Sequence, residues 1–124
     1  MAQPRVEPEI AFRLGADLDR AITREEVPDV VDGVAAALEV LDSRWTGYRF
    51  RPADVLADNT SAAGFVIGAW QPADASSLDA LGARVATFSV DDTVVATTSA
   101  SAILGDPVPA VVHWPSTSRT VARR

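Results

Sequence analysis

Strand-forming runs recur along almost the whole chain, and they limit its possible folds more than any other feature. Some alternate apolar and polar side chains, and one is continuously apolar. The last two strand-forming runs, residues 84–90 and 94–98, flank Asp91-Asp92-Thr93, which predicts a hairpin turn. The predicted strands are residues 6–14, 38–43, 62–70, 84–90 and 94–98, of which we expect 62–70 to be buried.

Helical signals are fewer. Thr23 and Glu26 have the spacing of a capping box, and apolar residues follow at helical intervals, which predicts a helix over residues 24–36. A proline near the first turn favours two more helices, at residues 52–57 and 107–114. Several strands with few helices, in mixed order, predict an α+β or mainly β domain.

Composition excludes several classes of function. The 124 residues are 48% apolar, which suits one domain with a core, and the net charge of −6 disfavours nucleic-acid binding. The chain has no cysteine and no lysine, which excludes thiolate metal sites and Schiff-base chemistry. No run is long enough to span a membrane and no signal pattern begins the chain, so we expect a cytoplasmic protein.

Three glutamates form the candidate chemical site. Glu7 and Glu9 share one face of a predicted strand, because alternate residues of a strand point the same way. Glu39 lies in an apolar stretch, where a carboxylate needs a partner. Oxygen ligands of this kind suit Mg²⁺ or Mn²⁺. A solvated strand face, or pairing of Glu39 with an arginine, would also explain the pattern.

Other polar residues allow two interpretations each. Arg44 could recognise a carboxylate or form a structural ion pair. Residues 58–61, which include Asn59 and Ser61, could line a site or form an ordinary capping turn. His113, the single histidine, is more typical of packing or surface than of catalysis.

Read together, four ordered blocks resemble the fumarylacetoacetate hydrolase family, in its branch of 2-keto-4-pentenoate hydratases and 4-oxalocrotonate decarboxylases. The similarity covers roughly residues 3–114. The blocks are residues 6–18 (VEPEIAFRLGADL), 37–44 (ALEVLDSR), 57–68 (ADNTSAAGFVIG) and 103–107 (ILGDP).

The resemblance implies an incomplete mixed β-roll, with Mg²⁺ or Mn²⁺ held by Glu7, Glu9 and Glu39. It also places Asn59 and Ser61 along a substrate pocket. The implied substrate is a small 2-oxo acid from aromatic meta-cleavage degradation. The implied reaction is hydration of a 2-hydroxy-2,4-dienoate to a 4-hydroxy-2-oxo acid, with decarboxylation of the 4-oxalocrotonate type as the alternative.

The chain also departs from the family pattern. Members are about twice as long, and the lysine that their N-terminal region supplies has no counterpart here. We therefore expect a metal-binding part at residues 1–114 and a non-family, disordered tail at 115–124. A truncated chain that only binds metal, or that associates with itself or with a full-length homologue, is a third interpretation.

Overall fold

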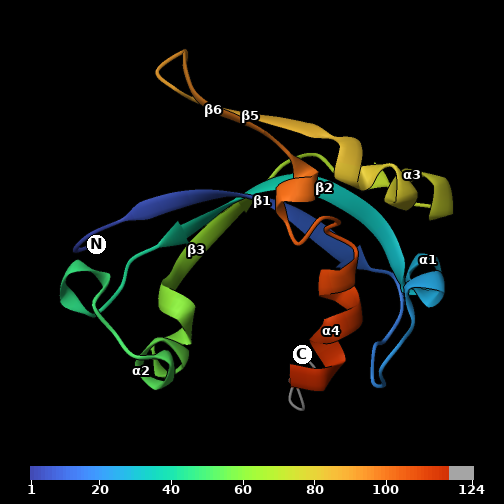
Figure 1. The fold of residues 1–124 in the computed structure, drawn as a ribbon, viewed down its shortest axis with the longest axis horizontal. Coiled ribbons are helices and arrows are strands. Elements are labelled where there is room, and N and C mark those ends of the chain that lie inside the picture. The colour runs from blue at the N-terminus through green and yellow to red at the C-terminus, as the bar shows by residue number, and fades with distance from the viewer. Residues whose placement is uncertain (118–124) are drawn as a thin grey trace. The chain divides into compact units, whose positions relative to one another are not determined.

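The computed structural model describes residues 1–117 and contains two sheets and several short helices, an α+β architecture (Figure 1). The larger sheet has the order β1-β2-β3, with β4 also paired to β2, and the smaller is the β5-β6 hairpin. The strands are β1 (Arg5–Leu14), β2 (Val31–Leu41), β3 (Ala62–Ile67), β4 (Gln71–Pro72), β5 (Val85–Val90) and β6 (Thr93–Ser99). The helices are α1 (Val27–Val30), α2 (Pro52–Ala57), α3 (Ala75–Asp79) and α4 (Pro109–Thr117).

The chain divides into two compact units, and β1 and β2 contribute residues to both. Unit 1 comprises Met1–Ala11 with Ala35–Ala69, and unit 2 comprises Phe12–Val34 with the described residues from Trp70 onward. Within unit 1, β2 and β3 are antiparallel and place Glu39 opposite Phe65. No helix within the described range is long and apolar enough to cross a membrane.

Most of the buried apolar side chains lie in unit 2. Val27 of α1 and Leu78 of α3 are almost fully buried. Arg24 forms ion pairs with two aspartates that lie far apart in sequence. Its guanidinium nitrogens are 2.8 Å from Asp79 Oδ1 and 2.8 Å from Asp106 Oδ2. These charge-assisted hydrogen bonds connect the segment before α1 to α3 and to the segment before α4, and the buried apolar side chains add to the stability of this packing.

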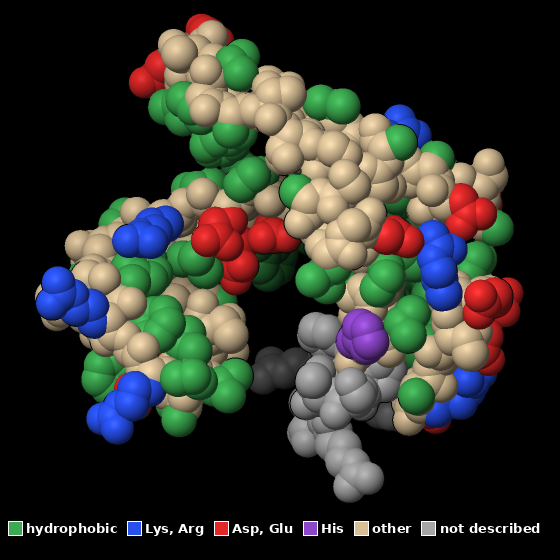
Figure 2. Space-filling model, viewed as in Figure 1, with side chains coloured by type: hydrophobic (Ala, Val, Ile, Leu, Met, Phe, Trp, Pro, Cys, Tyr) green, Lys and Arg blue, Asp and Glu red, His purple; other side chains and the backbone are tan. Residues whose placement is uncertain are grey.

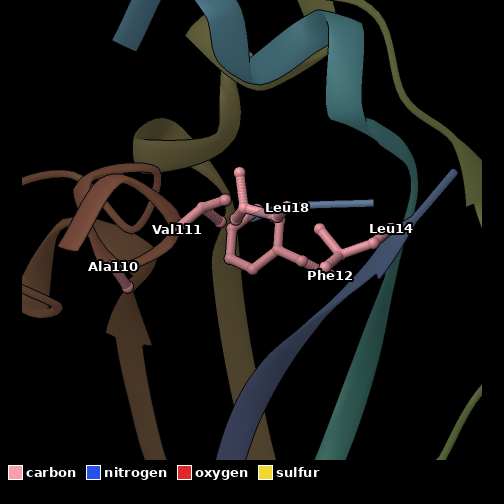
Figure 3. A pocket seen from close by; sticks show the side chains of 5 residues that line it. All are labelled: Phe12, Leu14, Leu18, Ala110 and Val111. Carbon is pink, nitrogen blue, oxygen red and sulfur yellow. The ribbon is translucent and has the colours of Figure 1, made fainter. Parts of the chain in front are cut away.

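Unit 2 also contains an apolar pocket of about 270 Å³ (Figure 3). Its lining comes from the end of β1, the segment after it, and α4. All the lining side chains are hydrocarbon, so this pocket supplies no group for catalysis or for holding a cation. They are Phe12, Leu14, Leu18, Ala110 and Val111.

Three sequence predictions are confirmed and one is wrong. Strand 6–14, helix 52–57 and the hairpin around Asp91 correspond to β1, α2 and β5-β6. The helix predicted over residues 24–36 is wrong: a 3₁₀ turn and the four residues of α1 precede β2, which begins at Val31. Val31, Gly33 and Ala35 are buried and alternate with more exposed neighbours, which is the period of two of a strand. The sequence prediction instead followed the valines of this segment, whose spacing also fits a helix.

Two further expectations need correction. Strand β3 lies within the predicted range 62–70 but is exposed. Consecutive residues point to opposite faces, and all from Ala63 to Ile67 are exposed, so neither face is covered along this strand; Phe65 is 74% exposed. Helix α4 does not stop at Pro115 but continues to Thr117. The rest of the predicted tail, residues 118–124, lies outside the described residues.

Candidate metal centre

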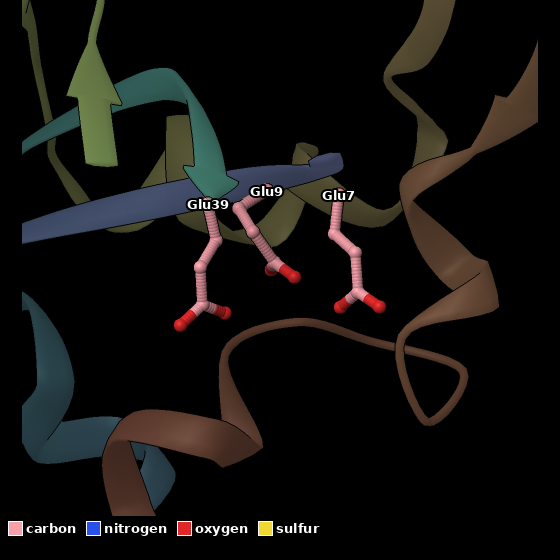
Figure 4. A group of neighbouring side chains, drawn as sticks. All are labelled: Glu7, Glu9 and Glu39. Atoms are coloured by element: carbon pink, nitrogen blue, oxygen red, sulfur yellow. The ribbon is translucent and has the colours of Figure 1, made fainter. Parts of the chain in front are cut away.

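The three glutamates singled out in the sequence converge in unit 1 (Figure 4). Glu7 and Glu9 project from one face of β1, and Glu39 projects from β2 toward the same side. One carboxylate oxygen from each residue lies within 4.8 Å of the others. Strand alternation accounts for the first two positions, and the pairing of β1 with β2 brings in the third.

The cluster concentrates negative charge. Partial burial raises the pKa of Glu9 above its usual value, and the charges of Glu39 and then Glu7 raise it further. Within the described part of the chain, no arginine lies within ion-pair distance of any of the three carboxylates. The repulsion is therefore not offset by an ion pair with any arginine side chain of residues 1–117.

This donor set fits a hard divalent cation. Three carboxylates supply oxygen ligands only, and such ligands suit Mg²⁺ or Mn²⁺ rather than metals that prefer nitrogen or sulfur. Glu7 and Glu9 are exposed and Glu39 is half-buried, so solvent or a small ligand can reach the cluster. Three carboxylates would leave open positions in an octahedral shell.

Arg44 forms the structural ion pair that was one of its two interpretations. Its guanidinium donates to the carboxylate of Asp58, and its Nη1 lies 3.0 Å from the Asp58 carbonyl oxygen. The same guanidinium, by hydrogen bonding, holds the pKa of the Asp58 carboxyl below its usual range. Contact between Arg44 and a substrate stays a prediction.

Asn59 and Ser61 lie in the turn that leads into β3. Asn59, Thr60 and Ser61 all have positive φ, which is strained for the β-branched Thr60. Ser61 is buried, and its hydroxyl donates to Asp58 Oδ2 over 3.0 Å, whereas Asn59 is exposed. Ser61 therefore takes part in the hydrogen bonding of the buried Asp58 carboxylate, and a pocket role for Asn59 and Ser61 stays a prediction.

Asp58 belongs to the turn that the sequence indicated, but its role as a buried hydrogen-bond acceptor was not predicted. Its buried carboxylate also accepts hydrogen bonds from the Ser43 hydroxyl, at 3.3 Å, and from the Arg44 backbone N–H, at 3.2 Å. These bonds tie the segment after β2 to the turn before β3 and so help to hold the β2-β3 pair that carries Glu39. The available signal was an aspartate flanked by turn-forming residues.

Neutralising one carboxylate should stabilise the cation-free chain. In EDTA at pH 7, we expect Glu9→Gln to raise the free energy of unfolding by on the order of 0.5 kcal/mol, after allowance for solvent screening of these exposed groups. Because the pKa of Glu9 is raised in the folded state, the folded state binds the proton of the Glu9 carboxyl more tightly than the unfolded state does. The contribution of the protonated Glu9 carboxyl to stability is thus present below the unfolded pKa of 4.5. It is lost as pH rises through the higher folded pKa.

Urea unfolding at pH 4 and pH 7 measures this effect, and the difference between the two proteins should shrink at pH 4. Asp17→Asn, which removes one charge from an exposed position outside the cluster, is the matched control. Equal gains from both substitutions would mean that net charge, rather than the cluster, governs the result.

Comparisons with known proteins identify the family of the chain. The profile of the family described as Fumarylacetoacetate (FAA) hydrolase C-terminal matches residues 1–123. A 4-oxalocrotonate decarboxylase of Pseudomonas sp is 41% identical over 88% of this chain and 41% of its own length. A 2-keto-4-pentenoate hydratase of Paraburkholderia xenovorans is 39% identical over 98% of this chain and 44% of its own.

A solved structure is also similar. The 4-oxalocrotonate decarboxylase from Pseudomonas putida G7, complexed with magnesium and adipate, has a TM-score of 0.79 at 29% identity and covers 90% of this chain and 42% of its own. The chain thus spans less than half the length of these relatives. The family match over nearly all its residues shows that the chain belongs to the fumarylacetoacetate hydrolase family.

Proposed function

We propose that Glu7, Glu9 and Glu39 hold a divalent cation, Mg²⁺ or Mn²⁺, at which the chain takes a small 2-oxo acid. The observation that carries the proposal is the convergence of three carboxylates without an arginine partner among the described residues. Relatives and a magnesium-bound structural neighbour support it. Such a cation would supply Lewis acidity toward the carboxylate and keto oxygens of the substrate.

The proposed reaction is hydration of a 2-hydroxy-2,4-dienoate, a net addition of one water that gives a 4-hydroxy-2-oxo acid. Support comes from the 2-keto-4-pentenoate hydratase and from a 2-hydroxyhexa-2,4-dienoate hydratase of Comamonas testosteroni, which is 38% identical over 94% of this chain and 44% of its own length. This chain's contribution is to hold the cation and to fix β2 against β3 through Asp58 and Arg44. The fold we propose is part of a mixed β-roll.

Decarboxylation is the second candidate. The specific observation for it is the similarity to decarboxylases in both sequence and structure, at 41% identity and a TM-score of 0.79. The three carboxylates serve either reaction, so they do not discriminate. The third candidate is binding of the cation without turnover. The observation for it is that these 124 residues contain no lysine that could act as a general base.

One set of assays separates the three candidates. The purified chain is given Mg²⁺ with 2-hydroxypenta-2,4-dienoate or with 4-oxalocrotonate, and diene absorbance and CO₂ release are followed. Turnover of the dienoate that Glu9→Gln abolishes supports the hydratase, and CO₂ release that Glu9→Gln abolishes supports the decarboxylase. Mn²⁺ binding with neither activity supports the cation-binding chain.

Cation binding should also stabilise the folded chain. At a free Mn²⁺ concentration 100 times the dissociation constant, we expect a gain of about 2.7 kcal/mol, because only the folded state brings the three carboxylates together. Urea unfolding with and without Mn²⁺ measures this gain. An unchanged midpoint at saturating Mn²⁺ would overturn the cation site, whatever the substrate.

A further inference from the structure

A turn of unit 1 exposes aromatic and arginine side chains together. We call Trp45, Arg49, Phe50 and Arg51 the arginine-aromatic patch; they lie in the segment between β2 and α2. Trp45 is 42% exposed and Phe50 is 38% exposed, and both arginines are at the surface. Figure 2 shows arginines among hydrophobic side chains over this part of the chain.

The end of the β5-β6 hairpin has the opposite charge. We call Val90, Asp91, Asp92, Val94 and Val95 the hairpin tip. Val94 is 59% exposed and Val95 is 55% exposed, and Figure 2 shows acidic side chains at the end of the hairpin with hydrophobic ones along it. The hairpin from Val85 to Ser99 contains no basic residue.

Both surfaces combine exposed apolar side chains with charged ones. The hairpin tip is acidic, and the patch carries Arg49 and Arg51, of which Arg51 also lies 3.8 Å from the Asp54 carboxylate. A two-stranded hairpin gains little stability alone, and packing against another surface stabilises it. Tryptophan and arginine are the residues that most often dominate the energy of protein interfaces. The arginine-aromatic patch is therefore complementary to the hairpin tip in charge and in apolar character.

We propose that the hairpin tip of one copy of this chain docks on the arginine-aromatic patch of a second copy. The contact is heterologous, since it joins two different surfaces. A few residues on each side bury less than a standard interface, so we expect a dissociation constant on the order of 10–100 µM that rises with salt. The proposal does not depend on the cation site.

Sedimentation equilibrium of the full chain in EDTA tests the proposal, with Asp91→Asn/Asp92→Asn as the first variant. Asparagine tolerates the positive φ of both positions, so the turn is preserved. The substitutions change the net charge from −6 to −4, which would strengthen association if general repulsion governed it. We expect the reverse, at least 5-fold weaker association.

The matched control removes two acidic charges elsewhere, in Asp17→Asn/Asp19→Asn, and should associate at least as well as the parent chain. In an Arg49→Gln/Arg51→Gln background, neutralising the hairpin tip should change association less than 2-fold, because its partner is already lost. A chain that is monomeric at 500 µM and 50 mM NaCl overturns the proposal, as does an undiminished effect in that background. Mn²⁺ affinity should be unchanged in all these variants, so failure of the interface and failure of the cation site are separable.

Discussion

The variant Glu7→Gln/Glu39→Gln is expected to bind Mn²⁺ at least 100-fold more weakly than the parent chain. Two of the three converging carboxylates become neutral amides, while their side-chain size is preserved. Loss of a group that only orients a ligand commonly lowers metal affinity by about 10–100-fold, and direct ligands should matter at least as much. Titration with Mn²⁺, followed by electron paramagnetic resonance, measures the affinity.

The matched control for this variant is again Asp17→Asn/Asp19→Asn, which changes net charge equally at exposed positions of unit 2. It should bind Mn²⁺ within about 2-fold of the parent, since long-range effects of exposed charges are screened. If the double glutamine variant also stays within 2-fold, the cation binds elsewhere and the proposed ligand set is wrong. Circular dichroism of each variant checks that the sheet is intact.

The positions of these ligands were accessible from the sequence to different degrees. Glu7 and Glu9 follow from strand alternation alone, because residues two apart share a face. Glu39 does not, since its approach depends on how β2 pairs with β1, two strands whose separation in sequence leaves the register open. Its apolar surroundings marked Glu39 as a candidate, the resemblance to a family implied that it is the third ligand, and the structure shows the three residues together.

Local patterns were reliable where one signal dominated. Helix α2 and the hairpin turn at Asp91 and Asp92 each have strong turn or capping chemistry. The segment from Val31 to Ala35 carried two periods at once, and strand pairing overrode the helical one. Burial of β3 was mispredicted because an apolar run indicates a strand but not whether other elements cover its faces.

The role of Asp58 lay beyond local patterns. A buried carboxylate requires several donors, and here they come from Ser43, Arg44 and Ser61. Ser43 and Arg44 lie about fifteen residues before Asp58, on the far side of α2. The sequence indicated a turn at residues 58–61, but only the fold shows that the turn is joined to the end of β2.

The variant Leu78→Ala is expected to lower the free energy of unfolding by about 2–5 kcal/mol, because it opens a cavity in the core of unit 2. Leu78 is 2% exposed, and its helix α3 packs on α1, where Val27 is fully buried. The control Leu78→Met nearly conserves volume and should cost less than about 1.5 kcal/mol. Urea unfolding followed by circular dichroism measures both values.

The same variant tests how far the cation site depends on the apolar core. All three glutamates lie in unit 1, so the folded Leu78→Ala chain should bind Mn²⁺ with the parent's affinity. Strands β1 and β2 contribute residues to both units, and their shared backbone pairing predicts one cooperative transition. Saturating Mn²⁺ should therefore raise the free energy of unfolding of Leu78→Ala as much as that of the parent. Two separate transitions, with Mn²⁺ shifting only one, would show instead that the units unfold independently.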